Sequence, residues 1–327
     1  MGLKIRERYG YIMRHKFNTI FTLTSLVTIS IHIINKITGS MYTVKNKLSG
    51  QDNHYYEWRF GKIRYTKNGT GTPLLLIHDL LPGSSQYEFH KISHLLSKSH
   101  EVYCIDLLGY GLSDKPNMTY TNYLYVEELN DFIKNIIGKK TDIIATGDAS
   151  PISIMACHND ANLINKMIFI NPQSLYQLNT IPSKQTKALK LLIEFPIIGT
   201  FIYNFLTSKE NIEKDFKNKY YYSPSSVKED DIDTYLESAH NNDSASRFSF
   251  ASYTGKYTNT NIIHALKEIN NSMYIIAGKE KEDIKTIIDN YIYYNISIES
   301  SFIPKTKHLP QLENPEELLN QLELYLN

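Results

Sequence analysis

The sequence predicts an α/β fold with a mostly parallel sheet flanked by helices, and two observations lead to this prediction. From residue 54 onward, short runs rich in apolar and β-branched residues alternate with stretches whose apolar residues recur at helical spacing. Such alternation favours parallel strands joined by right-handed crossovers. Residues 173–255 have no strand pattern, so they are predicted to form a helical cap inserted into an α/β core of residues 54–172 and 256–327.

The expected elements follow one another along this core. Short β-rich runs on either side of Gly61 predict a hairpin, and continuous apolar runs of strand length predict buried strands. The chain ends in a helix that begins at Pro315 and that Asn314 can cap. Strands are expected at 73–79, 100–109, 141–146, 167–170, 272–278 and 297–304, and helices at 87–98, 122–137 and about 151–158.

The N-terminal region differs from the rest of the chain. Residues 1–16 carry five Lys or Arg, and residues 17–34 hold no charged side chain unless His32 is protonated. Eighteen residues of helix span about 27 Å, close to the ~30 Å core of a bilayer. Residues 17–35 are therefore predicted to be a transmembrane signal anchor, with an amphipathic or buried helix as the alternative. The polar residues 36–53 are expected to be a linker, and the basic tail favours an N-terminus inside and a main domain outside the cytoplasm.

Bulk composition limits the classes of partner. The chain has 327 residues and a formal net charge of +1, so no nucleic-acid partner is expected. Its two cysteines, Cys104 and Cys157, lie in apolar stretches and are predicted to be packing residues. No group of Cys and His residues has the spacing of a zinc site, and no metal or cofactor is predicted.

Three motifs resemble those of one family. LLLIHD, residues 74–79, is similar to the strand-plus-His-Gly segment of the α/β-hydrolase superfamily, with Asp79 in place of the glycine. DLLGYGLSDKP, residues 106–116, resembles its D-x-x-G-x-G-x-S-x-x-P loop. HLPQLENPEELLNQL, residues 308–322, resembles its H-x-P-x-x-E-x-P segment. The resemblance covers residues 54–327 and implies an α/β-hydrolase fold related to ester and acyl hydrolases.

The resemblance also implies a nucleophile on a sharp strand-to-helix turn, a histidine as general base and a carboxylate that orients the histidine. His308 occupies the base position, and His78 has the structural position of the oxyanion loop. The oxyanion donors would be the backbone N–H groups of Leu80 and Ser150. Asp79 would place a negative charge beside any oxyanion and oppose its stabilisation.

The stretch ATGDAS, residues 145–150, contains the predicted turn, where a strand runs into Gly147. With Gly147 as the first glycine of the family's G-x-S-x-G motif, the nucleophile position is Ala149, which carries no nucleophile. Two other frames keep one. Asp148 would be a carboxylate nucleophile, and Ser150 would be a serine nucleophile, although each fits the glycine spacing less well.

The orienting acid is also absent from its usual place. After the predicted strand 272–278, the family's acid position holds Lys281, whose charge would repel a protonated histidine. Glu280 and Glu282 are candidate acids, with an ordinary solvated loop as the alternative. The family's other acid position holds the neutral Asn171.

These residues leave two hypotheses open. The first is a membrane-anchored, catalytically impaired member of the superfamily that binds a small apolar or acyl ligand, or a protein partner. The second is an active hydrolase of ester or related acyl substrates, with Ser150 or Asp148 as nucleophile and His308 as base. Its acyl pocket would be lined by residues 187–206, which otherwise form the core of the cap. Because loss of the nucleophile costs a serine protease about 10⁶ in turnover, the sequence favours the first hypothesis.

Overall fold

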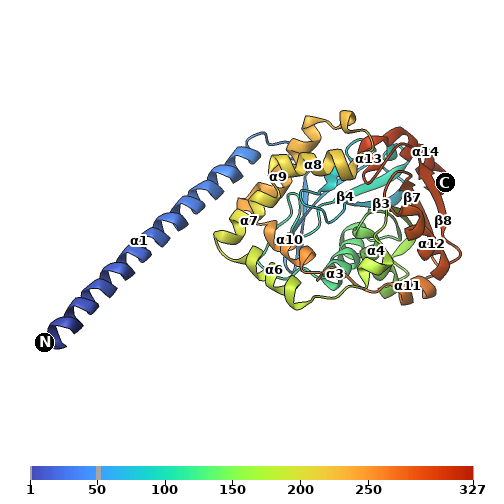
Figure 1. Cartoon of the computed structure of the whole chain (residues 1–327). Coiled ribbons are helices and arrows are strands. Elements are labelled where there is room, and N and C mark those ends of the chain that lie inside the picture. Colours follow the sequence, from blue (N-terminus) through green and yellow to red (C-terminus); the bar gives the residue numbers. More distant parts are fainter. Residues whose placement is uncertain (1, 49–52, 327) are drawn as a thin grey trace.

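The computed structural model describes residues 2–48 and 53–326, with side chains from residue 16 onward. An eight-stranded sheet crosses the main domain (Figure 1). Its strand order is β1-β2-β4-β3-β5-β6-β7-β8. The pairs β1–β2 and β2–β4 are antiparallel, and all pairs from β4 to β8 are parallel, which confirms the predicted fold class. The strands are β1 (His54–Trp58), β2 (Gly61–Asn68), β3 (Thr72–Ile77), β4 (His100–Ile105), β5 (Thr141–Thr146), β6 (Ile164–Ile170), β7 (Ser272–Gly278) and β8 (Glu299–Ile303).

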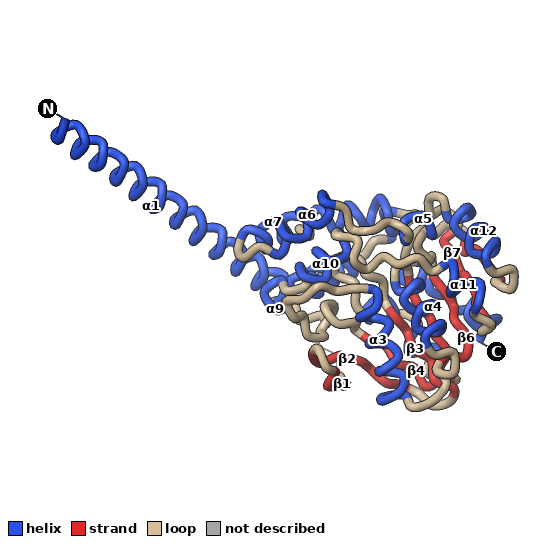
Figure 2. The backbone as a smooth tube through the Cα atoms, turned by 90° about the horizontal axis from the view of Figure 1, so that it is seen from below, coloured by secondary structure: helices blue, strands red, loops and turns tan. Residues whose placement is uncertain are grey.

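Two apolar layers pack on the two faces of the sheet. Side chains alternate along β3, so Leu75 and Ile77 enter one layer and Leu74 and Leu76 the other. The first layer is covered by α3 (Asn122–Phe132), α4 (Ala149–Asn159), α11 (Ile263–Glu268) and α12 (Ile284–Tyr294), several of which lie over the strands in Figure 2. The second is covered by α2 (Ser93–Leu96) and α14 (Pro315–Leu326).

The segment between β6 and β7 contains helices and no strand, as the sequence predicts. It reaches the core where the parallel strands end. Tyr235 donates a hydrogen bond to Glu88 across 3.2 Å, and Tyr253 donates one to Asp148 across 3.2 Å. The insertion thus supplies one wall of the region beyond the sheet edge. Before α11, its α-helices are α5 (Leu175–Leu178), α6 (Lys184–Glu194), α7 (Ile198–Leu206), α8 (Lys209–Asp215), α9 (Glu229–Ser244) and α10 (Arg247–Thr254).

The N-terminal helix α1 (Gly2–Thr43) projects from the domain as one continuous helix (Figure 1). Its stretch Lys16–Thr43 is long and apolar enough to span a membrane, with a mean hydropathy of 1.6 over its most apolar window. The predicted linker 36–53 is wrong for residues 36–43, which form the last two turns of α1. These turns pack against the helical insertion, with Lys36 paired to Asp243 at 2.7 Å. Residues 49–52 of the predicted linker lie outside the described residues.

Two other predicted elements differ for a tertiary reason. The helix expected at 87–98 is a short 3₁₀ turn, Gln86–Phe89, followed by the four residues of α2. The strand expected at 100–109 ends at Ile105, because the next residue, Asp106, turns into a buried network. Its carboxylate accepts hydrogen bonds from the Gln86 N–H at 2.7 Å and from the Arg64 guanidinium at 3.1 Å.

Candidate active site

The carboxyl ends of the parallel strands bring the candidate residues together. Asp79 follows β3, Gly147 follows β5 and Asn171 follows β6, while Lys281 and His308 follow β7 and β8. The carboxyl ends of parallel strands share one edge of the sheet, which is where α/β folds place their sites. Five residues separated by up to 229 positions therefore converge because the topology brings the ends of their strands together.

The turn from β5 into α4 is made by Gly147. Its φ is +53°, a left-handed conformation that glycine adopts without strain. A Cβ added at this position would overlap the carboxylate of Asp79. Helix α4 then begins at Ala149. The tip of the turn is thus two residues earlier than the sequence predicted.

The predicted frame for Ala149 is corrected by this turn. Ala149 is fully buried in the apolar layer beneath α4 and does not lie at the tip. The Ser150 hydroxyl is directed to the Ala145 carbonyl at 3.3 Å. The Ser150 N–H donates to the Gly147 carbonyl at 3.2 Å, so it is not available as the oxyanion donor that was predicted. The hydroxyl and the N–H of Ser150 therefore both donate within the turn.

Asp79 is the centre of the site. Its Oδ1 accepts hydrogen bonds from the backbone N–H groups of Leu80 at 2.7 Å and Asp148 at 2.8 Å. Its Oδ2 lies 2.7 Å from Nε2 of His308. Burial opposes ionisation of this carboxyl, but His308 and the two N–H groups outweigh burial and hold the pKa of Asp79 below its usual value. The three donors thus stabilise a buried anion.

His308 lies in the segment after β8, and two hydrogen bonds from other segments hold its backbone. Its N–H donates to the Tyr220 carbonyl at 2.9 Å, and its own carbonyl accepts from the Asn171 side chain at 2.9 Å. Burial lowers the pKa of His308, and the charge of Lys281 adds to this, while Asp79 opposes both. We infer a neutral imidazole whose Nε2–H donates to Asp79, since Asp79 is an acceptor only. Among the described side chains, no carboxylate is bonded to Nδ1.

Two further carboxyl groups surround Asp79. Asp148 accepts weak hydrogen bonds from Gln173 at 3.3 Å and Tyr253 at 3.2 Å. Burial, followed by the charge of Asp79, raises the pKa of Asp148 to about 7. The same two causes raise the pKa of Glu88 to about 8. Burial and the charge of Asp79 together keep Glu88 largely protonated at neutral pH and Asp148 about half protonated. Neither Asp148 nor Glu88 is bonded to His308.

The predicted acid position holds a partly buried lysine. Lys281 donates to the Asn171 carbonyl at 3.1 Å, and burial lowers its pKa to about 8 against the opposing charges of Asp79 and Asp148. The candidate acids Glu280 and Glu282 have exposed side chains and make no hydrogen bond with His308. They therefore do not orient the imidazole.

A cavity of about 450 Å³ opens beside His308. Its walls include Tyr220 and the side chains of Lys219, Lys281 and Lys307. None of residues 187–206 lines this cavity, so the acyl pocket predicted from that stretch does not lie beside His308. The alternative, a cap core, holds for part of the stretch, since Ile193 and Tyr203 are fully buried within the insertion while many of its other apolar side chains are exposed.

His78 has the structural role that was predicted. Its Nε2 accepts from the Leu107 N–H at 3.0 Å, so its Nδ1 carries the proton and donates to the Asp79 carbonyl at 2.6 Å. The sequence predicted the negative charge of Asp79 near the oxyanion position but not its hydrogen bond with His308. The signal was present in the sequence, since a carboxylate appears after His78 where the family has glycine, and glycine appears in the turn where the family has its nucleophile.

Comparisons with known proteins agree on the family. The model of the alpha/beta hydrolase family matches residues 74–321. A 2-hydroxy-6-oxo-6-(2'-aminophenyl)hexa-2,4-dienoic acid hydrolase of Metapseudomonas resinovorans is 29% identical over 118 residues, 35% of this chain and 40% of that protein. An uncharacterised protein of Mycobacterium bovis is 23% identical over 103 residues, 32% of this chain and 30% of that protein. The chain therefore matches well under half the length of these curated relatives.

Solved structures resemble the fold over most of the chain. A serine hydrolase involved in carbazole degradation has a TM-score of 0.67 and 16% identity, covering 84% of this chain and 98% of its own. The epoxide hydrolase CorEH has a TM-score of 0.68 and 16% identity, covering 83% and 96%. At such identities the likeness concerns the fold alone. The family model, which spans more than half of the sequence, shows that this chain belongs to the alpha/beta hydrolase family.

Proposed function

We propose that this protein is a membrane-anchored α/β-hydrolase-fold protein that does not perform serine-type acyl transfer. The observation that carries the proposal is the Asp79 carboxylate, which is bonded to two backbone N–H groups and to His308 at once. The anchor is supported by α1, and the missing acyl transfer by the geometry around Gly147.

Gly147 has the features of a nucleophile position without a nucleophile. In the G-x-S-x-G elbow, the oxyanion hole combines the N–H of the residue after the nucleophile with an N–H from the loop after the third strand. Here those donors are the N–H groups of Asp148 and Leu80, and both are directed at one oxygen of Asp79. With Gly147 at the nucleophile position, the motif is Ala145-Thr146-Gly147-Asp148-Ala149, and its central residue has no side chain.

The Asp79 carboxylate also occupies the oxyanion hole. One such donor contributes about 2.7–4 kcal/mol to acyl transfer when it meets the developing oxyanion. Here both donors already stabilise an anion, which would repel a second negative charge. Loss of the nucleophile removes on the order of 10⁶ in rate, about 8 kcal/mol of barrier. Both effects oppose ester hydrolysis through the usual route, and neither Ser150 nor Asp148 is bonded to His308.

One observation favours a second function, a hydrolase with Asp79 as a carboxylate nucleophile. Oδ2 would attack an alkyl carbon, for instance of an epoxide, so that the C–O bond breaks, an enzyme ester forms and the released alkoxide oxygen takes a proton from water. Oδ1 would become the ester carbonyl, already held by two N–H donors for the attack of water that His308 would deprotonate. This function requires His308 to release Oδ2 and the substrate to reach a carboxylate that is fully buried.

Three assays on the purified full chain test these functions. A fluorophosphonate probe should not label the protein, and p-nitrophenyl acetate turnover should equal that of His308→Ala. Labelling, or turnover that His308→Ala abolishes, would overturn the first proposal. For the second, a single turnover of styrene oxide in H₂¹⁸O should place ¹⁸O in the peptide that contains Asp79. Absence of both turnover and ¹⁸O would exclude the carboxylate route for this substrate.

The anchor is supported by the character of α1. Its apolar side chains between Phe17 and Ile34 are exposed, so the protein itself does not bury them. The hydroxyls of Thr22, Ser25 and Thr28 each donate to the carbonyl four residues earlier, at 2.8 Å. Such internal bonds satisfy polar groups that hydrocarbon cannot. We place the N-terminus inside and the main domain outside the cytoplasm. Resistance to carbonate extraction, and protease protection of the domain in sealed vesicles, test this arrangement.

A further inference from the structure

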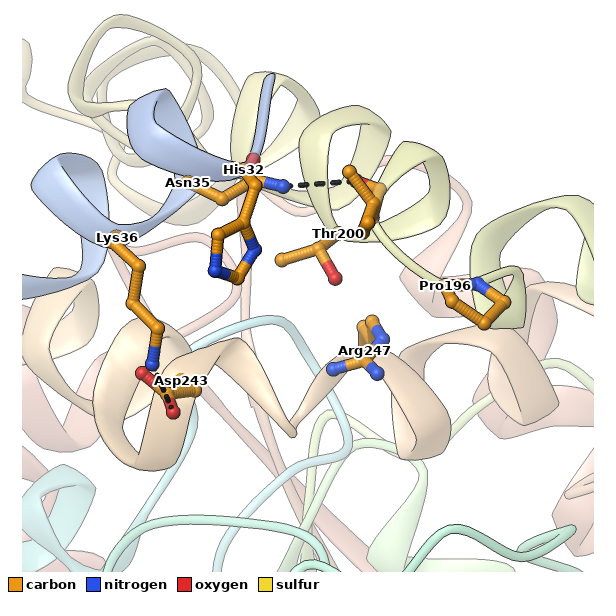
Figure 3. Close-up of a pocket in the computed structure, with 8 residues that line it drawn as sticks. His32, Asn35, Lys36, Pro196, Thr200, Asp243 and Arg247 are labelled. Carbon is orange, nitrogen blue, oxygen red and sulfur yellow. Dashed lines mark hydrogen bonds and ion pairs between the residues drawn. The ribbon is translucent and has the colours of Figure 1, made fainter. Parts of the chain in front are cut away.

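A second cavity, of about 210 Å³, lies where α1 meets the helical insertion (Figure 3). Three sides enclose it. His32, Asn35 and Lys36 come from α1, and Pro196, Ile197 and Thr200 from the α6–α7 turn and α7, while Asp243 and Arg247 come from α9 and α10. Small-molecule sites usually have about 300–1,000 Å³, so this cavity suits a compact group.

Arg247 is the unpaired cation of this cavity. Among the described side chains, none forms a hydrogen bond or ion pair with it, and its buried Nε has no partner. The guanidinium lies 4.1 Å from the centroid of Phe248. The nearby carboxylates have other partners, since Asp243 is paired with Lys36 at 2.7 Å and Glu194 with Lys190 at 2.7 Å. The cavity therefore carries a net positive charge without an anion to compensate it.

Arg247 is placed so that its charge can bind an anionic group in the cavity. Burial lowers its pKa, but a guanidinium remains charged in proteins. In Figure 3 its nitrogens and the hydroxyl of Thr200 are on facing walls of the cavity. A partly buried guanidinium with free N–H donors matches the geometry of a phosphate group, which it can bind through two parallel hydrogen bonds.

The cavity also lies at the end of the apolar stretch of α1. Contact between α1 and the insertion is marked by Asn35, whose side chain donates to the Ile197 carbonyl at 2.9 Å and accepts from Asn204 at 3.3 Å. Ile197 has φ +64°, a costly conformation for a β-branched residue, so this contact holds a strained turn. If residues 17–34 cross a bilayer, the cavity lies at its surface.

An exposed apolar face borders the cavity. Helix α7 lies beside the point where α1 joins the domain, and α6 meets α7 at an angle of 103° (Figure 2). On α6 the exposed side chains recur at helical spacing, and so do those on α7. At the end of α6 they are Leu191, Leu192 and the capping residue Phe195. On α7 they are Ile198, Phe201 and Phe205. Apolar side chains gathered in this way mark a contact surface, and their place beside the predicted span matches the headgroup boundary of a bilayer.

We propose that the cavity at Arg247 binds the phosphate of an anionic phospholipid while the apolar face of α6 and α7 enters the same leaflet. This inference rests on the proposed membrane anchor. Arg247 provides the charge, and Thr200 and Lys36 are further donors on the cavity wall. The acyl chains would extend along the exposed side chains of α1 and α7. The lipid would thereby hold the insertion in one orientation toward the membrane.

The full chain in nanodiscs provides the test. Discs of phosphatidylcholine alone and discs with 10% phosphatidic acid are compared by native mass spectrometry after release in mild detergent. We expect one phosphatidic acid to be retained per chain, and Arg247→Gln to reduce this retention by about tenfold or more. Lys285→Gln, which removes one exposed charge elsewhere, should leave it unchanged. Arg247→Lys and Thr200→Val should give intermediate losses while the thermal unfolding midpoint stays near that of the wild type.

Three results would overturn the headgroup site. Equal retention by Arg247→Gln and the wild type, or equal retention of phosphatidylcholine and phosphatidic acid, would exclude a headgroup site. Stabilisation by inorganic phosphate equal to that by the lipid would assign the cavity to free phosphate. Carbonate extraction of the same variants separates the two proposals. An extractable wild type would refute the anchor, whereas a membrane-bound Arg247→Gln without lipid retention would support both the anchor and the site.

Discussion

The loops after β3 and β5 meet at the site, and each departs from the family's motif. One has lost a side chain and the other has gained one. The turn after β5 keeps the backbone of a nucleophile elbow but has glycine at its tip, Gly147. The loop after β3 keeps its N–H donor at Leu80 but has gained a carboxylate, Asp79. Because a Cβ at Gly147 would overlap this carboxylate, the two changes depend on each other. The backbone of a nucleophile elbow can therefore persist without its nucleophile when a carboxylate from another loop binds its N–H donor.

The largest effect is expected when the gained carboxylate is removed. Asp79→Ala leaves the N–H groups of Leu80 and Asp148 and the imidazole of His308 without their shared acceptor. Each buried donor left without its acceptor usually costs about 1–3 kcal/mol of folding free energy, and three donors lose theirs here. Denaturant unfolding of the full chain in detergent measures this. Asp79→Asn is the matched control, with a smaller loss since an amide oxygen can still accept. Unchanged stability of Asp79→Ala would show that the carboxylate is not part of the folded network.

The reciprocal change at the turn should be smaller but informative. Gly147→Ser forces a side chain against Asp79 and should cost about 1–3 kcal/mol, the usual range for overpacking. In the double variant Asp79→Gly/Gly147→Ser the overlap is removed, so the two costs should not add. The double variant should also gain p-nitrophenyl acetate turnover on the order of 10²-fold over either single variant, because the two N–H donors become free. Additive costs and no gain would contradict the reciprocal relation.

The shifted pKa values around Asp79 also predict how folding stability depends on pH. The folded-state pKa of Asp148 is raised to about 7 and that of Glu88 to about 8, so the folded protein binds more protons than the unfolded chain from about pH 4 to these values. Stability should therefore fall as pH rises through this window. Lys281, lowered to about 8, acts oppositely and should restore stability between about pH 8 and 10.5. Thermal unfolding midpoints from pH 4 to 10 measure both limbs, and Asp148→Asn should flatten the decline. Because the lowered pKa of His308 and other buried histidines adds stability as pH rises toward 6.5, the test is the difference between the wild type and Asp148→Asn, and identical pH profiles would contradict the role of Asp148.

The smallest effect is expected at the residue that the sequence placed in the nucleophile position. Ala149→Ser adds a hydroxyl to a fully buried site in α4 and should cost about 1–2 kcal/mol. It should not create esterase activity, because the side chain lies in the apolar layer and not at the tip of the turn. The same ester assay measures this beside Gly147→Ser. Activity gained by Ala149→Ser alone would restore the predicted frame.

Local pattern was sufficient for much of the fold. β5 and β7 match their predicted residues, 141–146 and 272–278, because continuous apolar runs bounded by polar residues are typical of buried parallel strands. His308 and His78 were also found from motifs that are contiguous in sequence. Elements whose ends depend on distant partners were predicted less well. β4 ends at Ile105, before the predicted residue 109, because Asp106 makes contacts with Gln86 and Arg64.

The sequence by itself determined the order of strands and helices, the helical insertion, the apolar N-terminal segment and the strand ends where site residues would gather. These follow from periodicities within about ten to twenty residues. Only the tertiary structure decided that Gly147 and not Ala149 forms the tip of the turn, and that Asp79 is the partner of His308. The physical reason is that both facts depend on one carboxylate reaching three donors on three loops. Leu80 is its neighbour, but Asp148 and His308 are 69 and 229 residues away.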